Sequence, residues 1–170
     1  MPNIGIEVPV GQQFSVAADW MYAWWSRNRS HNYWRIYGGE IEGRYWIGNR
    51  ADYKPLHGHH IGLYAQAITY DFIFGRHGYM GGVPKGSLWD KASFGAGVSY
   101  GYACRLARNI TIDFSIGIGY LGGDYQKYHP EDNCYVYDCT RRLNYIGPTR
   151  AEMSIVWPLH FGKRKKGGAQ

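Results

Sequence analysis

Apolar and polar residues alternate along almost the whole chain, and a period of two is the signature of β-strands. The alternating stretches are 3–10, 14–24, 37–47, 59–74, 93–106, 110–120 and 151–161. Each has about 8 to 16 residues, whereas an average strand of a soluble protein has roughly 5–6 and a membrane-crossing strand roughly 9–11. The pattern predicts an all-β chain of seven antiparallel strands, each paired with its neighbours in sequence order.

The connections between the predicted strands alternate in length. Two turns are tight and the segment 49–58 is intermediate, whereas the connections at 26–32, 75–91 and 122–143 are long or polar. Outer-membrane barrels have short turns at one end and longer loops at the other, and a soluble sandwich has no reason for this asymmetry. A change of phase near Asp71 also predicts a β-bulge there.

One face of the predicted strands is apolar, and its rings gather at the strand ends. We expect this face to point outward, toward lipid, at Val98, Tyr100, Ile112, Phe114, Ile116, Met153 and Ile155. Aromatic rings favour the level of the lipid headgroups. The sequence therefore predicts two aromatic girdles, formed on the loop side by Trp24, Trp25, Trp34 and Tyr120 and on the turn side by Tyr45, Trp46, Tyr100, Tyr102 and Trp157.

The opposite face carries charges of both signs separated by glycines. In a narrow barrel these side chains fill the interior, where a buried charge needs a partner. We therefore expect an ion-pair network inside, made of Glu40, Glu42, Arg44, Arg105, Asp113, Arg150 and Glu152. The alternative is a soluble ligand-binding barrel with an apolar interior, in which these charges would lie on a solvated exterior.

Composition agrees with strands and excludes a membrane-spanning helix. The chain of 170 residues has 24 Gly and 16 Tyr, whereas charged residues make up only 19%. Its mean hydropathy is -0.45, and it contains no run of about 18 apolar residues. The net charge of +6 is local, because much of it lies in the tail 162–170. We therefore divide the chain into a barrel, 1–161, and a basic tail, 162–170, and expect no nucleic-acid partner.

Cysteines and histidines offer few candidates for chemistry. Cys134 and Cys139 share a polar predicted loop, where a short disulfide is one hypothesis and a zinc site with His129 a weaker one. His57 and His59 form another weak candidate for a metal site. None of these sets has a full complement of ligands at standard spacing, so we predict neither a metal nor a cofactor.

The order and spacing of several short motifs resemble a known family. They are Pro2-Asn3-Ile4-Gly5-Ile6-Glu7, the Ser15-Val16 to Trp24-Trp25 stretch, Glu42-Gly43-Arg44-Tyr45-Trp46, 95–102 and Gly147-Pro148-Thr149-Arg150. The chain resembles the DUF3575 family of small outer-membrane barrels from Bacteroidetes. The resemblance implies an eight-stranded barrel, with a signal peptide and a first strand before the Pro-Asn position. We therefore expect a truncated N-terminus or misassigned start, and a seam between residues 4–10 and 151–161.

The function expected from these features is that of a non-enzymatic protein of the bacterial outer membrane. It would be structural, or it would bind a partner through its outer loops, and its partners would be outer-membrane lipid and another envelope protein. An enzyme that acts on lipid is the alternative, with candidate residues His31, Asp71, His77 and Ser87 near the loop side. No GxSxG motif or comparable arrangement supports that alternative.

Overall fold

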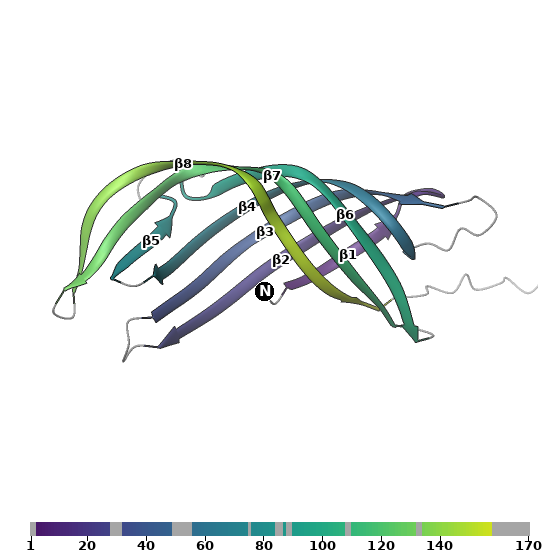
Figure 1. Cartoon of the computed structure of the whole chain (residues 1–170), viewed down its shortest axis with the longest axis horizontal. Helices are drawn as coiled ribbons and strands as arrows, with labels where there is room; N and C mark the ends of the chain where they lie inside the picture. Colours follow the sequence, from purple (N-terminus) through teal and green to yellow (C-terminus); the bar gives the residue numbers. More distant parts are fainter. Residues whose placement is uncertain are drawn as a thin grey trace, which may run out of the picture.

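A computed structural model describes residues 3–27, 32–48, 56–74, 76–83, 87, 90–107, 110–131 and 134–157, and its strands form one antiparallel sheet (Figure 1). The strands are β1 (Asn3–Pro9), β2 (Phe14–Arg27), β3 (Asn32–Ile47), β4 (Gly58–Phe74), β5 (His77–Gly81), β6 (Ser93–Ala107), β7 (Ile110–Glu131) and β8 (Cys134–Val156). The described residues contain no helix that is long and apolar enough to cross a membrane. The predicted all-β antiparallel architecture is confirmed.

The long strands pair in sequence order, apart from one short insertion. β1, β2, β3 and β4 form successive pairs, β4 then pairs with β6, and β6, β7 and β8 complete the sheet. β5 pairs with the last four residues of β4 and with β7, beyond the point where β6 begins. This fifth strand lies inside a segment, 75–91, that the sequence predicts as a loop, so the predicted count of seven strands was one too low.

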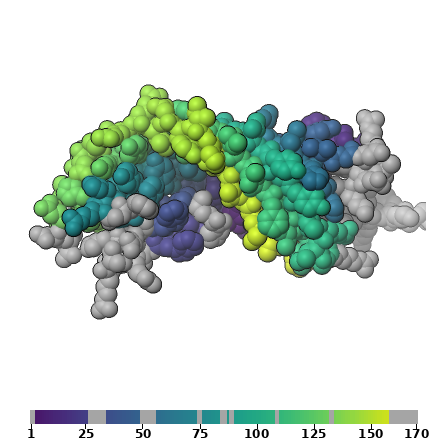
Figure 2. Space-filling model, in the orientation of Figure 1, coloured from purple at the N-terminus to yellow at the C-terminus, as the bar shows by residue number. Residues whose placement is uncertain are grey.

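The prediction of a second long loop, at 122–143, was also wrong. Residues of this segment continue β7 to Glu131 and begin β8 at Cys134, and the paired strands arch beyond the rest of the sheet at one end (Figures 1 and 2). Cys134 and Cys139 are free thiols in this structure. Both lie on β8, and five residues of strand separate their Cα atoms by roughly 16 Å. A disulfide requires less than about 7 Å, so the hypothesis of a disulfide between Cys134 and Cys139 was wrong.

The sheet curls so that its two end strands approach each other without pairing. The described strand pairings include no ladder between β1 and β8. The two strands do meet through side chains, because the Asn3 amide donates to a Glu152 carboxylate oxygen at 2.7 Å. The seam predicted between residues 4–10 and 151–161 is therefore present in the part of the chain described; residues 158–161 lie outside it.

The two faces of the sheet differ in the way the alternation predicts. The outer face, as we call the one with Ile41 and Val98, is exposed, and Ile116, Met153 and Ile155 have exposed fractions of 66%, 66% and 72%. Ile112 is half-buried. The inner face carries the buried polar residues. The predicted bulge near Asp71 was wrong, because the β3–β4 register is continuous there.

Candidate functional site

The inner face brings together charged side chains from strands far apart in the sequence. Alternation places Glu40, Glu42 and Arg44 on this face of β3, Asp113 on β7, and Arg150 with Glu152 on β8. Because the sheet curls, β3 faces β7 and β8 across the interior, and ion pairs join them directly. Six of the seven residues predicted for the inner network therefore converge.

Arg44 is the centre of one half of the network. Its Nε lies 2.6 Å from Glu42, and its Nη1 lies 2.9 Å from Glu7 and 3.1 Å from Asp113. The Asp113 carboxylate also lies 2.9 Å from Nε2 of His60, whose side chain is fully buried. This half ties four strands together, because its members come from β1, β3, β4 and β7.

Arg150 is the centre of the other half. Its guanidinium nitrogens contact three carboxylates at 2.5 to 2.9 Å, those of Glu40, Glu42 and Glu152. Glu42 belongs to both halves, is fully buried, and also accepts a hydrogen bond from the Ser99 hydroxyl. Removing one partner from such a buried pair typically costs about 3–5 kcal/mol, so the network holds opposite walls of the curled sheet together.

Neutral side chains and glycines complete the packing of the interior. The Tyr64 hydroxyl is hydrogen-bonded to Thr149, and Arg150 lies over the Tyr64 ring at 5.7 Å. Space for Tyr64 comes from a glycine on the neighbouring strand β6: a Cβ added at Gly97, its partner in the β4–β6 pair, would lie 2.5 Å from the Tyr64 hydroxyl oxygen. Glycine on this face is therefore required by close packing.

Arg105 does not belong to the network, contrary to the prediction. Arg105 lies on the inner face of β6, as predicted. It pairs with Thr111 near the turn, however, and is therefore closer to the end of the sheet than Asp113, which pairs with Ala103. At this open end the side chain is exposed, and its Nε donates to the Ala107 carbonyl at 3.3 Å. Face can be predicted from alternation, whereas depth along the strand depends on register.

The sequence prediction missed His60 and the part played by Glu7 in the network. His60 shares a face with Tyr64 and Gln66, and this face is opposite to that of Ile61 and Leu63. The same parity would have placed it inside. The signal was thus present, but the prediction considered the histidines around His60 only as metal ligands.

Eight of the nine predicted girdle residues are exposed, and Trp46 is not. Tyr100 lies in the middle of β6, where it pairs with Ile116, so it is not at a strand end. Trp25 and Trp34 pair with each other on the inner face, whereas the girdles were predicted on the outer face. Trp46 is 2% exposed, packs against His60, and donates from Nε1 to the Ser15 hydroxyl at 2.8 Å. Its neighbours Tyr45 and Ile47 occupy the outer face, so alternation forces Trp46 inward. The exposed rings are Trp24, Trp25, Trp34, Tyr45, Tyr100, Tyr102, Tyr120 and Trp157.

The chain matches one known protein family over most of its length. The model of the family described as "Protein of unknown function (DUF3575)" matches residues 1–159. The chain belongs to the DUF3575 family. Neither a curated protein nor a solved structure matches it.

One group of carboxylates on the inner face of this DUF3575 protein has the geometry to hold a cation. Oxygens of Asp19, Glu40 and Glu152 lie within 4.8 Å of one another. Arg150 already compensates two of the three. The group is therefore accounted for as part of the ion-pair network.

The other residues considered for metal binding are engaged separately. His59 lies on the outer face, where its Nδ1 is 2.7 Å from the Tyr100 hydroxyl. His129 contacts Asp138 at 2.6 Å and Glu131 at 3.6 Å. Within the described chain, the only group of three or more metal-ligating side chains close enough to share an ion is the carboxylate group above, and Cys134, Cys139 and His129 do not form such a group.

The described residues considered for lipid chemistry each make separate contacts in this DUF3575 protein. Asp71 pairs with Arg35 at 3.4 Å and accepts a hydrogen bond from Tyr128. Ser87 donates to Asp90, and His77 is exposed at the start of β5. His31 lies outside the described residues, so these contacts describe three of the four candidates.

Proposed function

We propose that this DUF3575 protein is a non-enzymatic protein of a bacterial outer membrane, in which the outer face of the curled sheet contacts lipid. The observation that carries the proposal is the inverted polarity of the sheet. Exposed positions are apolar, whereas the buried positions include Glu42, Arg44, Asp113 and Arg150. A soluble protein would gain free energy by burying the first set and exposing the second.

The length of the apolar band supports a membrane. On β7 the outer-face positions from Ile110 to Tyr120 are all Ile, Phe or Tyr, a stretch of about 11 residues. A tilted strand crosses the hydrocarbon core with roughly 9–11 residues. Beyond Tyr120 the same face carries Asp124 and Gln126, as expected for a strand that leaves the lipid.

The filled interior supports a role that is structural or involves binding at the rim. The two arginines and their carboxylates occupy the middle of the inner face, and the cavity beside Glu152 at the seam has a volume of only about 100 Å³. Small barrels are filled by side chains in this way. The arch of β7 and β8, together with β5, is the surface that we propose meets another envelope component.

Refolding into lipid vesicles tests the proposal. The full chain, diluted from denaturant into phosphatidylcholine vesicles, should float with them, resist extraction by alkaline carbonate, and migrate differently in gels before and after boiling. An Ile116→Arg variant, which places a charge in the centre of the apolar band, should insert less. A chain that folds to a soluble monomer without lipid or detergent would contradict the proposal.

A further inference from the structure

The outer face of the sheet changes its chemistry at the end where β7 and β8 arch. On β4 the outer-face positions Ala65 and Ala67 are followed by Thr69 and Asp71, and on β3 the corresponding position is Arg35. At the same level the inner face carries aromatic rings, such as Phe72 and Tyr79, which contact each other in a tilted arrangement with centroids 5.5 Å apart. In this region the outer face therefore carries polar and charged side chains as well as apolar ones.

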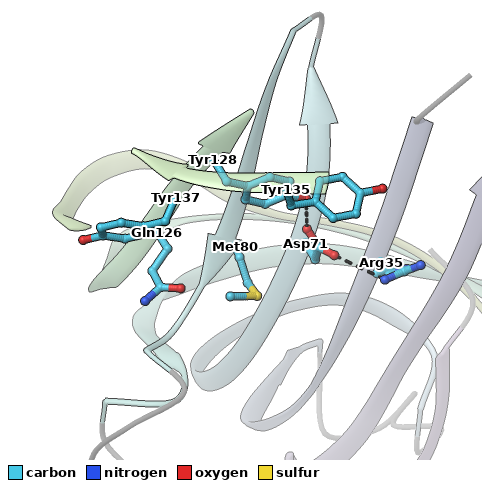
Figure 3. Close-up of a pocket in the computed structure, with 7 residues that line it drawn as sticks. All are labelled: Arg35, Asp71, Met80, Gln126, Tyr128, Tyr135 and Tyr137. Carbon is cyan, nitrogen blue, oxygen red and sulfur yellow. Dashed lines mark hydrogen bonds and ion pairs between the residues drawn. The ribbon is translucent and has the colours of Figure 1, made fainter. Parts of the chain in front are cut away.

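A cavity of about 330 Å³ lies on this polar part of the outer face (Figure 3). We call it the rim pocket, and it is lined by Arg35, Asp71, Met80, Gln126, Tyr128, Tyr135 and Tyr137. Ligand pockets usually measure about 300–1,000 Å³, so the rim pocket has room for one small ligand. Its walls come from β3, β4, β5, β7 and β8.

The strand register builds the floor of the pocket. Arg35 pairs with Asp71, Asp71 with Met80, and Met80 with Gln126. Residues paired across antiparallel strands share a face and stand side by side. Four side chains from four strands therefore form one row, and β5, which the sequence did not predict, supplies the link between β4 and β7.

Tyrosine rings form the wall above this row. Tyr128 donates to Asp71 Oδ1 at 2.5 Å, and its ring meets the Tyr135 ring edge to face, with centroids 5.4 Å apart. The Tyr128 ring lies across Gly78, where an added Cβ would be 2.1 Å from the ring. Tyr137 pairs with Tyr128 on the neighbouring strand and is 57% exposed.

The charge of the pocket is balanced. The only ionised side chains among its lining residues, Arg35 and Asp71, lie 3.4 Å apart and offset each other. Burial and the Asp71 carboxylate raise the pKa of the Tyr128 phenol above its usual range, so this hydroxyl remains a donor. Arg35 also lies over the ring of Trp24, at 4.4 Å, beside the loop-side girdle.

We propose that the rim pocket binds a neutral saccharide. A sugar ring offers apolar C–H faces that pack on aromatic rings, and hydroxyls that bond to planar polar groups such as Gln126, Asp71 and Arg35. The charge balance disfavours an anionic ligand, because the Arg35 guanidinium is already paired with the Asp71 carboxylate. The pocket faces outward beside the girdle, so the saccharide can be free or can be the headgroup of a glycolipid in the surrounding leaflet. This second source rests on the membrane location proposed above.

Binding of defined sugars to the full chain in detergent tests the proposal. A panel of neutral gluco-, galacto- and manno-oligosaccharides is titrated, with glucose 6-phosphate and inorganic phosphate as anionic comparisons. A second arm compares phosphatidylcholine vesicles with and without digalactosyldiacylglycerol. We expect saturable binding of at least one neutral sugar and weaker binding of the anions. Binding only to the vesicles that contain digalactosyldiacylglycerol would identify the lipid-borne source. Binding of sugars in detergent as well would identify a free saccharide.

Variants connect that binding to the pocket. Tyr137→Ala should weaken binding about tenfold, the loss of roughly one aromatic contact, and Gly78→Ala should weaken it by displacing Tyr128. Tyr145→Ala is the control, because it removes an exposed ring of β8, the strand of Tyr137, that lies outside the pocket. This variant should bind normally. Equal binding by all three variants, or no saccharide bound in either arm, would overturn the proposal. Vesicle flotation of each variant separates this failure from failure of the membrane location.

Discussion

Arg150 offers the sharpest test of the ion-pair network, because its removal strands a charge. The side chain is 4% exposed and contacts three carboxylates. In an Arg150→Met variant, Glu42 keeps Arg44, and Glu152 keeps its hydrogen bonds from Asn3 and Ser154. Glu40 loses its ion pair with Arg150, at 2.9 Å, which is its only ion pair among the described residues.

The expected loss is therefore set by one stranded buried carboxylate, about 3–5 kcal/mol of unfolding free energy. The assay is denaturant unfolding in detergent micelles, followed by tryptophan fluorescence and analysed at a common m-value. Arg105→Met is the matched control, since Arg105 is exposed, and should change stability by less than about 0.5 kcal/mol. Adding Glu40→Gln to Arg150→Met removes the stranded charge and should recover a large part of the loss.

Equal stability of the two single variants would refute the reasoning. It would mean that water or rearranged side chains replace Arg150 at no cost. A large loss for Arg105→Met would equally contradict the structure, because it would require that side chain to be buried in the network.

Three further predictions follow from the packing, the outer face and the register. Gly97→Ala should cost at least about 1 kcal/mol, because the added Cβ would lie 2.4 Å from a backbone oxygen of β7, whereas Gly43→Ala, with nothing within 4 Å, should be neutral in the same unfolding assay. Ile116→Arg should lower the stability in a bilayer by about 2–4 kcal/mol, measured by denaturant titration in vesicles. Cys134 and Cys139 should remain unlinked to each other under oxidising conditions, and a peptide carrying both as a disulfide in mass spectrometry would show that the β8 register is different.

Alternation of residue types predicted much of the fold. The two faces, the seven long strands and six members of the inner network follow from parity alone. Parity also places Trp25, Trp34, Trp46 and His60 on the inner face, although the prediction put the three tryptophans in girdles and overlooked His60. These errors came from interpreting residue types apart from their positions.

The arch of β7 and β8 could not be predicted in the same way. Up to Tyr120, apolar residues on one face of β7 and small or polar residues on the other produce a strong alternation. Beyond Tyr120, aromatic and polar residues such as Tyr125 and Gln126 follow one another without a period. β5 has only five residues, two of them glycine, and its pairing depends on strands distant in sequence. The rim pocket consequently had no signature in the sequence.

A spin-label scan along β7 tests the central claim most directly. Single cysteines from 112 to 128, in a chain with Cys104, Cys134 and Cys139 replaced by serine, are labelled in vesicles and probed with oxygen and with a water-soluble nickel complex. At Phe114, Ile116 and Ile118 we expect high accessibility to oxygen and little to nickel. At Asp124 and Gln126 nickel accessibility should rise. Outer-face labels that are accessible to nickel along the whole strand would show that lipid does not cover this face, and would contradict the account.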